Sequence, residues 1–139
     1  MIDRNDVLDK AIAIESLMSI LITLKFFPLH GAKIDFLEIM MNDESATTNY
    51  KRSVLMKCYP EAKGIDEAIR SVFYIRNVFA HSGGLVFHPI DGSSPINLDP
   101  RKPGQDIDLE GKLKKFNRDY AVVNARLFEI LQTTRIIIE

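Results

Sequence analysis

The fold prediction starts from the stretch Ile75-Arg76-Asn77-Val78-Phe79-Ala80-His81-Ser82-Gly83-Gly84, which combines an apolar helical pattern with a clear stop. At about 100° per residue, Arg76 falls within a face formed by Ile69, Val72, Phe73, Phe79 and Ala80. Ile75 and Val78 make the other side apolar as well, so the pattern predicts a central, buried helix. The Ser-Gly-Gly sequence after His81 is typical of a helix end.

Arg76 and His81 bring two kinds of chemistry to this helix. Arginine carries a permanent charge and a fork of donors that suits phosphate, and histidine is the side chain best placed to move protons near neutral pH. Asn77 lies four residues before His81, so the two can lie one above the other on the helix surface. The three residues predict a site for RNA or another phosphate-bearing substrate.

A purely structural interpretation of the same residues stays open. A histidine in a last helical turn often only satisfies terminal carbonyls and the helix dipole. A buried arginine needs an opposite charge, and the acidic residues available for this inside a bundle are Glu15, Asp35 and Glu38. The spacing alone does not decide between these interpretations.

The segment Arg76-Asn77-Val78-Phe79-Ala80-His81 resembles the signature of the HEPN superfamily, in which an arginine precedes a histidine by a few residues and a polar residue often follows the arginine. HEPN domains are helical bundles, usually homodimers, and many are metal-independent endoribonucleases with toxin or defence roles. The resemblance implies that Arg76 and His81 are catalytic and Asn77 an accessory, that no cofactor or metal is needed, and that RNA and an antitoxin or regulatory protein are partners.

The resemblance has one departure and one alternative. Many HEPN toxins carry a tyrosine two residues after the histidine, which a nucleotidyltransferase antitoxin modifies, whereas this chain has Gly83 there. The motif match covers only residues 76–81, and the helix order extends the likeness to the rest of the chain less specifically. Related bundles of the mannitol-repressor family are regulatory, so a non-catalytic transcriptional or protein-interaction module is the alternative.

The composition is that of an ordinary globular domain. The 139 residues, 46% hydrophobic and 27% charged, predict one domain over residues 1–139 with a substantial core. A net charge of −1 does not favour binding of nucleic acid by bulk electrostatics, so any RNA contact must be local. The apolar stretch at 12–27 is interrupted by polar residues, which predicts that it does not span a membrane. The charged N-terminus lacks a leader pattern and Cys58 is the single cysteine, so we expect a cytoplasmic protein.

The apolar spacing predicts an all-α, up-and-down bundle of about five helices. The expected helices run from Asp6 to Phe27, Ile34 to Met41, Ala46 to Cys58, Ile65 to His81 and Leu109 to Ile136. Asp3, Asn5 or Asp6 can cap the first helix. The last helix begins with a basic cluster, which either contacts a phosphate backbone or forms a solvated face: Lys112, Lys114, Lys115 and Arg118.

The segment between the last two helices, residues 82–108, is rich in glycine and proline. It predicts either a long surface loop or a small hairpin, with Leu85–His88 and Ile96–Leu98 as strands and Asp91-Gly92 as a turn. Because it leaves directly from the predicted site, it either folds over that site or lies loosely on the surface.

The expected chemistry is attack of an RNA 2′-hydroxyl on the adjacent phosphorus, which needs a base, an acid and positive charge on the phosphate. One chain offers one suitable histidine, so a two-fold dimer that joins two copies of His81 and Arg76 would complete the site. The competing hypotheses are a non-enzymatic interaction module and a regulator that binds a small ligand or nucleotide. Cys58 and His81 form a weaker candidate pair for nucleophilic chemistry.

Overall fold

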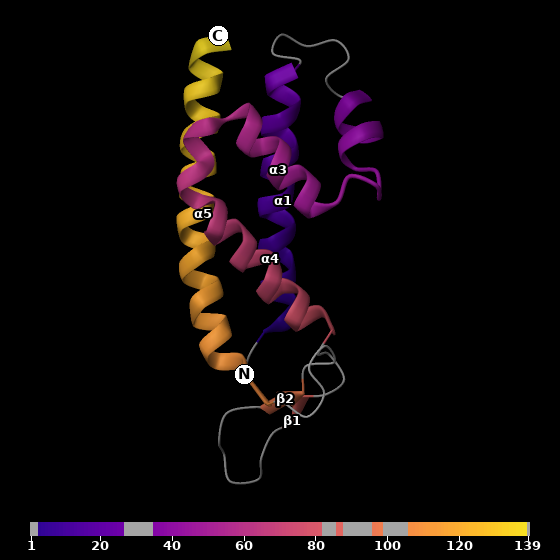
Figure 1. Cartoon of the computed structure of the whole chain (residues 1–139), viewed down its shortest axis with the longest axis vertical. Helices are drawn as coiled ribbons and strands as arrows, with labels where there is room; N and C mark the ends of the chain where they lie inside the picture. Colours follow the sequence, from indigo (N-terminus) through magenta and orange to yellow (C-terminus); the bar gives the residue numbers. More distant parts are fainter. Residues whose placement is uncertain (1–2, 27–34, 82–85, 88–95, 99–105, 139) are drawn as a thin grey trace.

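The computed structural model describes residues 3–26, 35–81, 86–87, 96–98 and 106–138. Its framework consists of four α-helices, α1 (Arg4–Phe26), α3 (Thr48–Cys58), α4 (Asp66–His81) and α5 (Leu109–Ile138), within the described residues (Figure 1). Two short helices complete it, a π-helix η1 (Phe36–Met41) and a 3-10 helix η2 (Pro60–Ile65). The prediction of an all-α bundle is confirmed.

The core lies where α1, α4 and α5 meet. α1 and α5 begin near the same end of the molecule, and α4 runs back in the opposite direction across them (Figure 1). α3 packs mainly on α1. The largest fully buried side chains come from all four α-helices, and they include Ile14, Met18, Leu21, Leu55, Ile69, Phe79, Phe116 and Leu127. A continuous apolar core of this kind supplies most of the stability of a bundle.

Helix α1 begins two residues before its predicted start. The side-chain oxygen Oδ1 of Asp3 accepts the backbone N–H of Asp6 at 3.1 Å, so Asp3 satisfies one of the free donors at this helix end. Of the three predicted caps, Asp3 is therefore the one used. The helix ends at Phe26, and its predicted last residue, Phe27, lies outside the described residues.

The segment after α1 differs from the prediction in its details. The second predicted helix is the short π-helix η1, which buries Met41 but leaves Ile39 and Met40 exposed. α3 begins at Thr48 rather than Ala46, because the hydroxyl of Thr47 accepts the N–H of Tyr50 at 3.2 Å and caps the helix. α3 ends at Cys58, as predicted. The 3-10 helix η2 was not predicted, and Pro60 starts it with its fixed φ angle.

Helix α4 is not buried on all sides, and this prediction is wrong. Its apolar residues do face the core, but Arg70 and Tyr74 are exposed and Arg76 is half-buried at the edge of the packed face. An apolar wheel does not say how many neighbours a helix has. α4 packs on α5, α1 and α3 and leaves one side open, where the Lys112 ammonium lies 5.1 Å from the centroid of the Tyr74 ring.

The predicted hairpin after α4 is present. β1 (Val86–Phe87) pairs antiparallel with β2 (Ile96–Leu98), with Phe87 opposite Ile96. A third strand, β3 (Asp106–Asp108), pairs with β2 and was not predicted, because Asp-Ile-Asp carries little strand propensity. The predicted turn at Asp91-Gly92, and most of the segment expected to fold over the site, lie outside the described residues.

Helix α5 begins at Leu109, as predicted, and continues two residues beyond the expected end, to Ile138. The carboxylate of Asp108 accepts the N–H of Gly111 at 3.0 Å and so caps the helix start. Helix α5 packs an apolar stripe against the core. Its buried members are Phe116, Val123, Leu127 and Ile130, and its partly buried members are Leu113, Tyr120 and Leu131.

Candidate functional site

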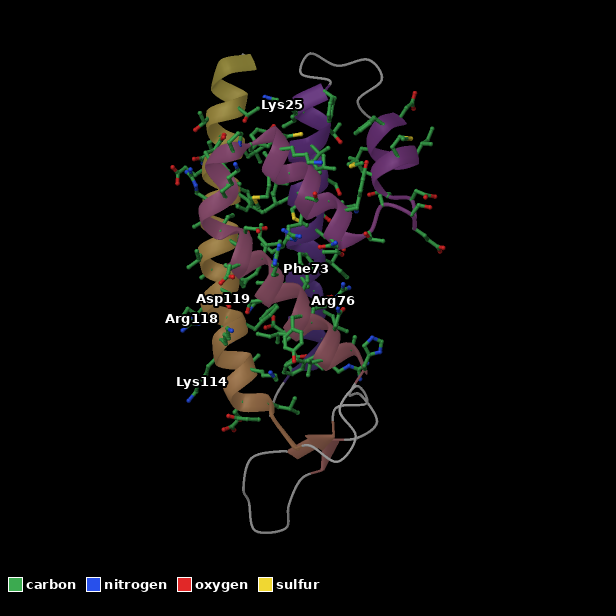
Figure 2. The ribbon with its side chains drawn as sticks, viewed as in Figure 1. Lys25, Phe73, Arg76, Lys114, Arg118 and Asp119 are labelled. Carbon is green, nitrogen blue, oxygen red and sulfur yellow. The ribbon has the colours of Figure 1, made fainter. Side chains whose placement is uncertain are left out.

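Arg76 lies on the wall of an open polar cleft of about 590 Å³ between α1, α4 and the start of α3 (Figure 2). Helix α1 contributes Ile12, Glu15, Ser16 and Ser19, and α3 contributes its first turn and Lys51. The turn before α3, which includes Asp43 and Glu44, forms the rim. The size of the cleft is within the range of small-ligand sites.

The guanidinium group of Arg76 has no opposite charge among the described residues. Its Nε is buried and makes no hydrogen bond, and its central carbon lies 5.5 Å from the centroid of the Phe73 ring, a cation–π distance. The predicted neutralising residues do not pair with it. Glu15 pairs with Lys51 instead, and Asp35 and Glu38 are exposed. Arg76 therefore presents a positive charge that the described part of the bundle leaves uncompensated.

Lys51 is the second cation of the cleft, and its place there was not predicted from the sequence. Only 5% of this residue is exposed, and its Nζ lies 3.1 Å from Oε1 of Glu15. A lysine is rarely buried to this extent without a pairing carboxylate. One signal was available: Lys51, Leu55 and Cys58 follow the spacing of a buried helical stripe, and they are the buried residues of α3.

Ser19 is the second residue of the cleft that was not predicted from the sequence. It is 2% exposed, it lines the cleft, and its hydroxyl oxygen has no hydrogen-bond partner. Its backbone carbonyl accepts the Thr23 hydroxyl at 2.8 Å, which is a separate interaction along α1. Buried hydroxyls are normally paired, so a free one at a cleft wall is a donor available to a ligand.

The other two predicted site residues lie outside the cleft lining. His81 is the last residue of α4 and is exposed, and Asn77 is half-buried. Because a helix rises 1.5 Å per residue, His81 lies about 7.5 Å further along the axis than Arg76. The structure thus joins Arg76 to Lys51, Glu15 and Ser19, and it leaves His81 open to solvent at the adjacent helix end.

Cys58 is buried, and it is poorly placed for chemistry. Burial raises the pKa of its thiol above the usual value, and the opposing charge of Lys25 is the smaller influence. A protonated thiol is a weak nucleophile. Figure 2 shows Lys25, the charge that acts on this thiol, near the end of the bundle remote from Arg76. The Cys58–His81 pair considered from the sequence is therefore not formed.

Two further groups of cations lie on other faces. The predicted basic cluster at the start of α5 is mostly exposed, and Arg118 lies 3.6 Å from the carboxylate of its neighbour Asp119 (Figure 2). A second cleft, of about 670 Å³, lies where α3, η2 and α4 join. Its charged residues are Arg52, Lys57, Lys63, Arg70 and Asp66, and Asp66 pairs with both arginines.

No family model matches this chain, and no curated protein or solved structure matches it. Within the described ranges, no group of three or more His, Cys, Asp or Glu side chains is arranged to hold a metal ion. No described helix combines the length and apolar character needed to cross a membrane.

Proposed function

We propose that this protein is a metal-independent endoribonuclease of the HEPN type, with Arg76, Asn77 and His81 in an active site that a second copy of the chain completes. The observation that carries the proposal is the state of Arg76. Its charge is uncompensated among the described residues and faces an open cleft, five positions before an exposed histidine. A buried arginine that serves stability normally has a carboxylate partner, whereas the half-buried Arg76 has none among the described residues.

The roles of the three residues follow from their chemistry. Arg76 binds the scissile phosphate and stabilises the negative charge that develops on its oxygens. His81 removes the proton of the attacking 2′-hydroxyl or protonates the leaving 5′-oxygen. Asn77, four residues earlier on the same helix, orients His81 or contacts the RNA. The products are a 2′,3′-cyclic phosphate and a 5′-hydroxyl.

The need for two proton transfers supports a homodimer. His81 is the one histidine that the structure describes, so a second copy would supply the second imidazole. An exposed apolar residue borders the cleft at a suitable place: Ile12 of α1 lines the cleft and is 57% exposed. Ile20, two helical turns further along α1, is also exposed. Exposed apolar side chains grouped beside a polar site are typical of a subunit interface.

The test is cleavage of a mixed RNA pool in excess EDTA, beside a DNA pool of the same sequences. The mechanism predicts that RNA is cut, that the new ends are 2′,3′-cyclic phosphates, and that DNA stays intact because it lacks the 2′-hydroxyl. Cleavage of both pools, or RNA ends with a 3′-hydroxyl, would contradict the mechanism. Absence of cleavage by the folded dimer would favour the second candidate function.

The second candidate is a non-catalytic binding or regulatory module, as in the mannitol-repressor-like alternative. One observation favours it: Arg76 lines the cleft, whereas Asn77 and His81 do not. In such a module the cleft would hold a ligand without cutting it, and replacing His81 would leave ligand binding unchanged.

A further inference from the structure

We propose that the cleft between α1, α3 and α4 is a phosphate-binding site in which Lys51 and Ser19 hold the phosphate together with Arg76. This inference deepens the proposed function, and the part of it that concerns RNA rests on that function. The phosphate has two possible sources, a free phosphate or phosphomonoester and a phosphodiester of an RNA strand. The same three donors would bind either one.

The donors of the cleft are incompletely used. The ammonium group of Lys51 has three N–H donors, and Glu15 is its one hydrogen-bond partner among the described residues. The Nε of Arg76 and the hydroxyl of Ser19 are buried and have no hydrogen-bond partner in the part of the chain that the structure describes. Leaving buried donors unsatisfied is unfavourable, and an anion with several oxygens would satisfy all of them at once.

The start of α3 adds to the positive potential that Lys51 and Arg76 create in the cleft. Its first-turn residues Thr48 and Asn49 line the cleft, and the backbone N–H groups of a first turn have no partner within the helix. The hydroxyl of Thr47 accepts a hydrogen bond from the N–H of Tyr50. The backbone N–H groups of Thr48 and Asn49 are therefore the ones left for a ligand. Helix starts of this kind favour anions.

The acidic residues of the cleft do not cancel this potential. Glu15 is committed to Lys51, so with Arg76 the inner wall carries one net positive charge. Asp43 accepts the N–H of Ser45 at 2.9 Å, and this bond holds the pKa of its carboxyl below the usual value. Asp43 and Glu44 lie exposed at the rim. Because exposed charges are screened by water, the rim limits rather than prevents entry of an anion.

The experiment is an NMR titration of the isotope-labelled full chain with two probes, inorganic phosphate and a short 2′-O-methyl RNA that the proposed chemistry cannot cut. Wild-type protein should show saturable shifts of the Ser19, Thr48 and Asn49 amides with at least one probe. Shifts with inorganic phosphate alone would identify the free anion as the ligand. Shifts with the RNA alone would identify the phosphodiester as the ligand. No saturable shift at these amides with either probe would overturn the proposal.

Two variants test the donors and are chosen to leave no buried charge unpaired. Ser19→Ala removes a hydroxyl that makes no bond, and the double variant Glu15→Gln/Lys51→Met removes the buried pair together, so that no charge is stranded. The double variant should weaken binding about tenfold or more. Arg70→Met is the matched control, because Arg70 is on α4, the helix that carries Arg76, but lines the second cleft. Loss of binding in Arg70→Met but not in the double variant would overturn the assignment.

The readouts separate this proposal from the proposed function. Binding is measured with probes that the proposed chemistry cannot cleave, and cleavage is measured separately with unmodified RNA. If phosphate binds through Lys51 while RNA is never cut, the endoribonuclease proposal alone fails. If RNA is cut but the double variant binds and cleaves like wild type, the phosphate site alone fails.

Discussion

At the scale of single residues, the cleft takes its polar groups from three helices, with Arg76 on α4, Lys51 on α3 and Ser19 on α1. Arg76 was found because a charge within an apolar helical face is conspicuous. Lys51 and Ser19 belong to helices far from it in sequence, and their roles depend on how α1 and α3 pack beside α4. A pattern within one helix carries no such information, so these residues became visible only in the folded chain.

The unpaired state of Arg76 leads to a prediction about stability. Arg76→Ala should lower the free energy of unfolding by only about 1 kcal/mol, since the interaction that its side chain makes among the described residues is a cation–π contact with Phe73. Urea denaturation of the two proteins measures this difference. Lys51→Ala should lower the free energy of unfolding by more, because it leaves the Glu15 carboxylate in the cleft without its ion-pair partner. A loss of several kcal/mol in Arg76→Ala would show that the arginine has a structural partner.

At the scale of secondary-structure elements, the long periodic helices were predictable and the short elements were not. The apolar stripes of α1 and α5 repeat over many turns, so their existence and approximate ends followed from the spacing. η2 and β3 each span a few residues whose conformation depends on neighbouring elements. The exposure of one side of α4 could not be predicted either, because it depends on the number of helices packed around it.

The start of α3 forms one side of the cleft, and its cap provides a test of that geometry. Thr47→Ala should lower the free energy of unfolding by about 1 kcal/mol, because the N–H of Tyr50 loses its side-chain acceptor. Thr47→Ser keeps the hydroxyl and should be close to wild type. Thermal or urea unfolding of both variants measures the effect. Equal losses in the two variants would mean that the methyl group, rather than the cap, stabilises this turn.

At the scale of the whole molecule, the proposed dimer interface lies beside the cleft. Ile12→Asp places a charge at an exposed apolar position on the cleft wall and should shift the protein from dimer to monomer in analytical ultracentrifugation, with a parallel loss of RNA cleavage. Val122→Asp is the control, since Val122 on α5 is 49% exposed and lines neither described cleft. Dissociation by Val122→Asp but not by Ile12→Asp would place the interface on another face.

The measurement that tests the central claim most directly is the single-turnover rate of RNA cleavage in EDTA for wild type and His81→Ala. His30→Ala serves as the control, because it removes a histidine outside the motif. Loss of a general acid or base lowers rates by roughly 10²–10⁴-fold, so we predict a fall of at least a hundredfold in His81→Ala and no change in His30→Ala. Undiminished cleavage by His81→Ala would contradict the assignment of the Arg76–His81 motif as the active site.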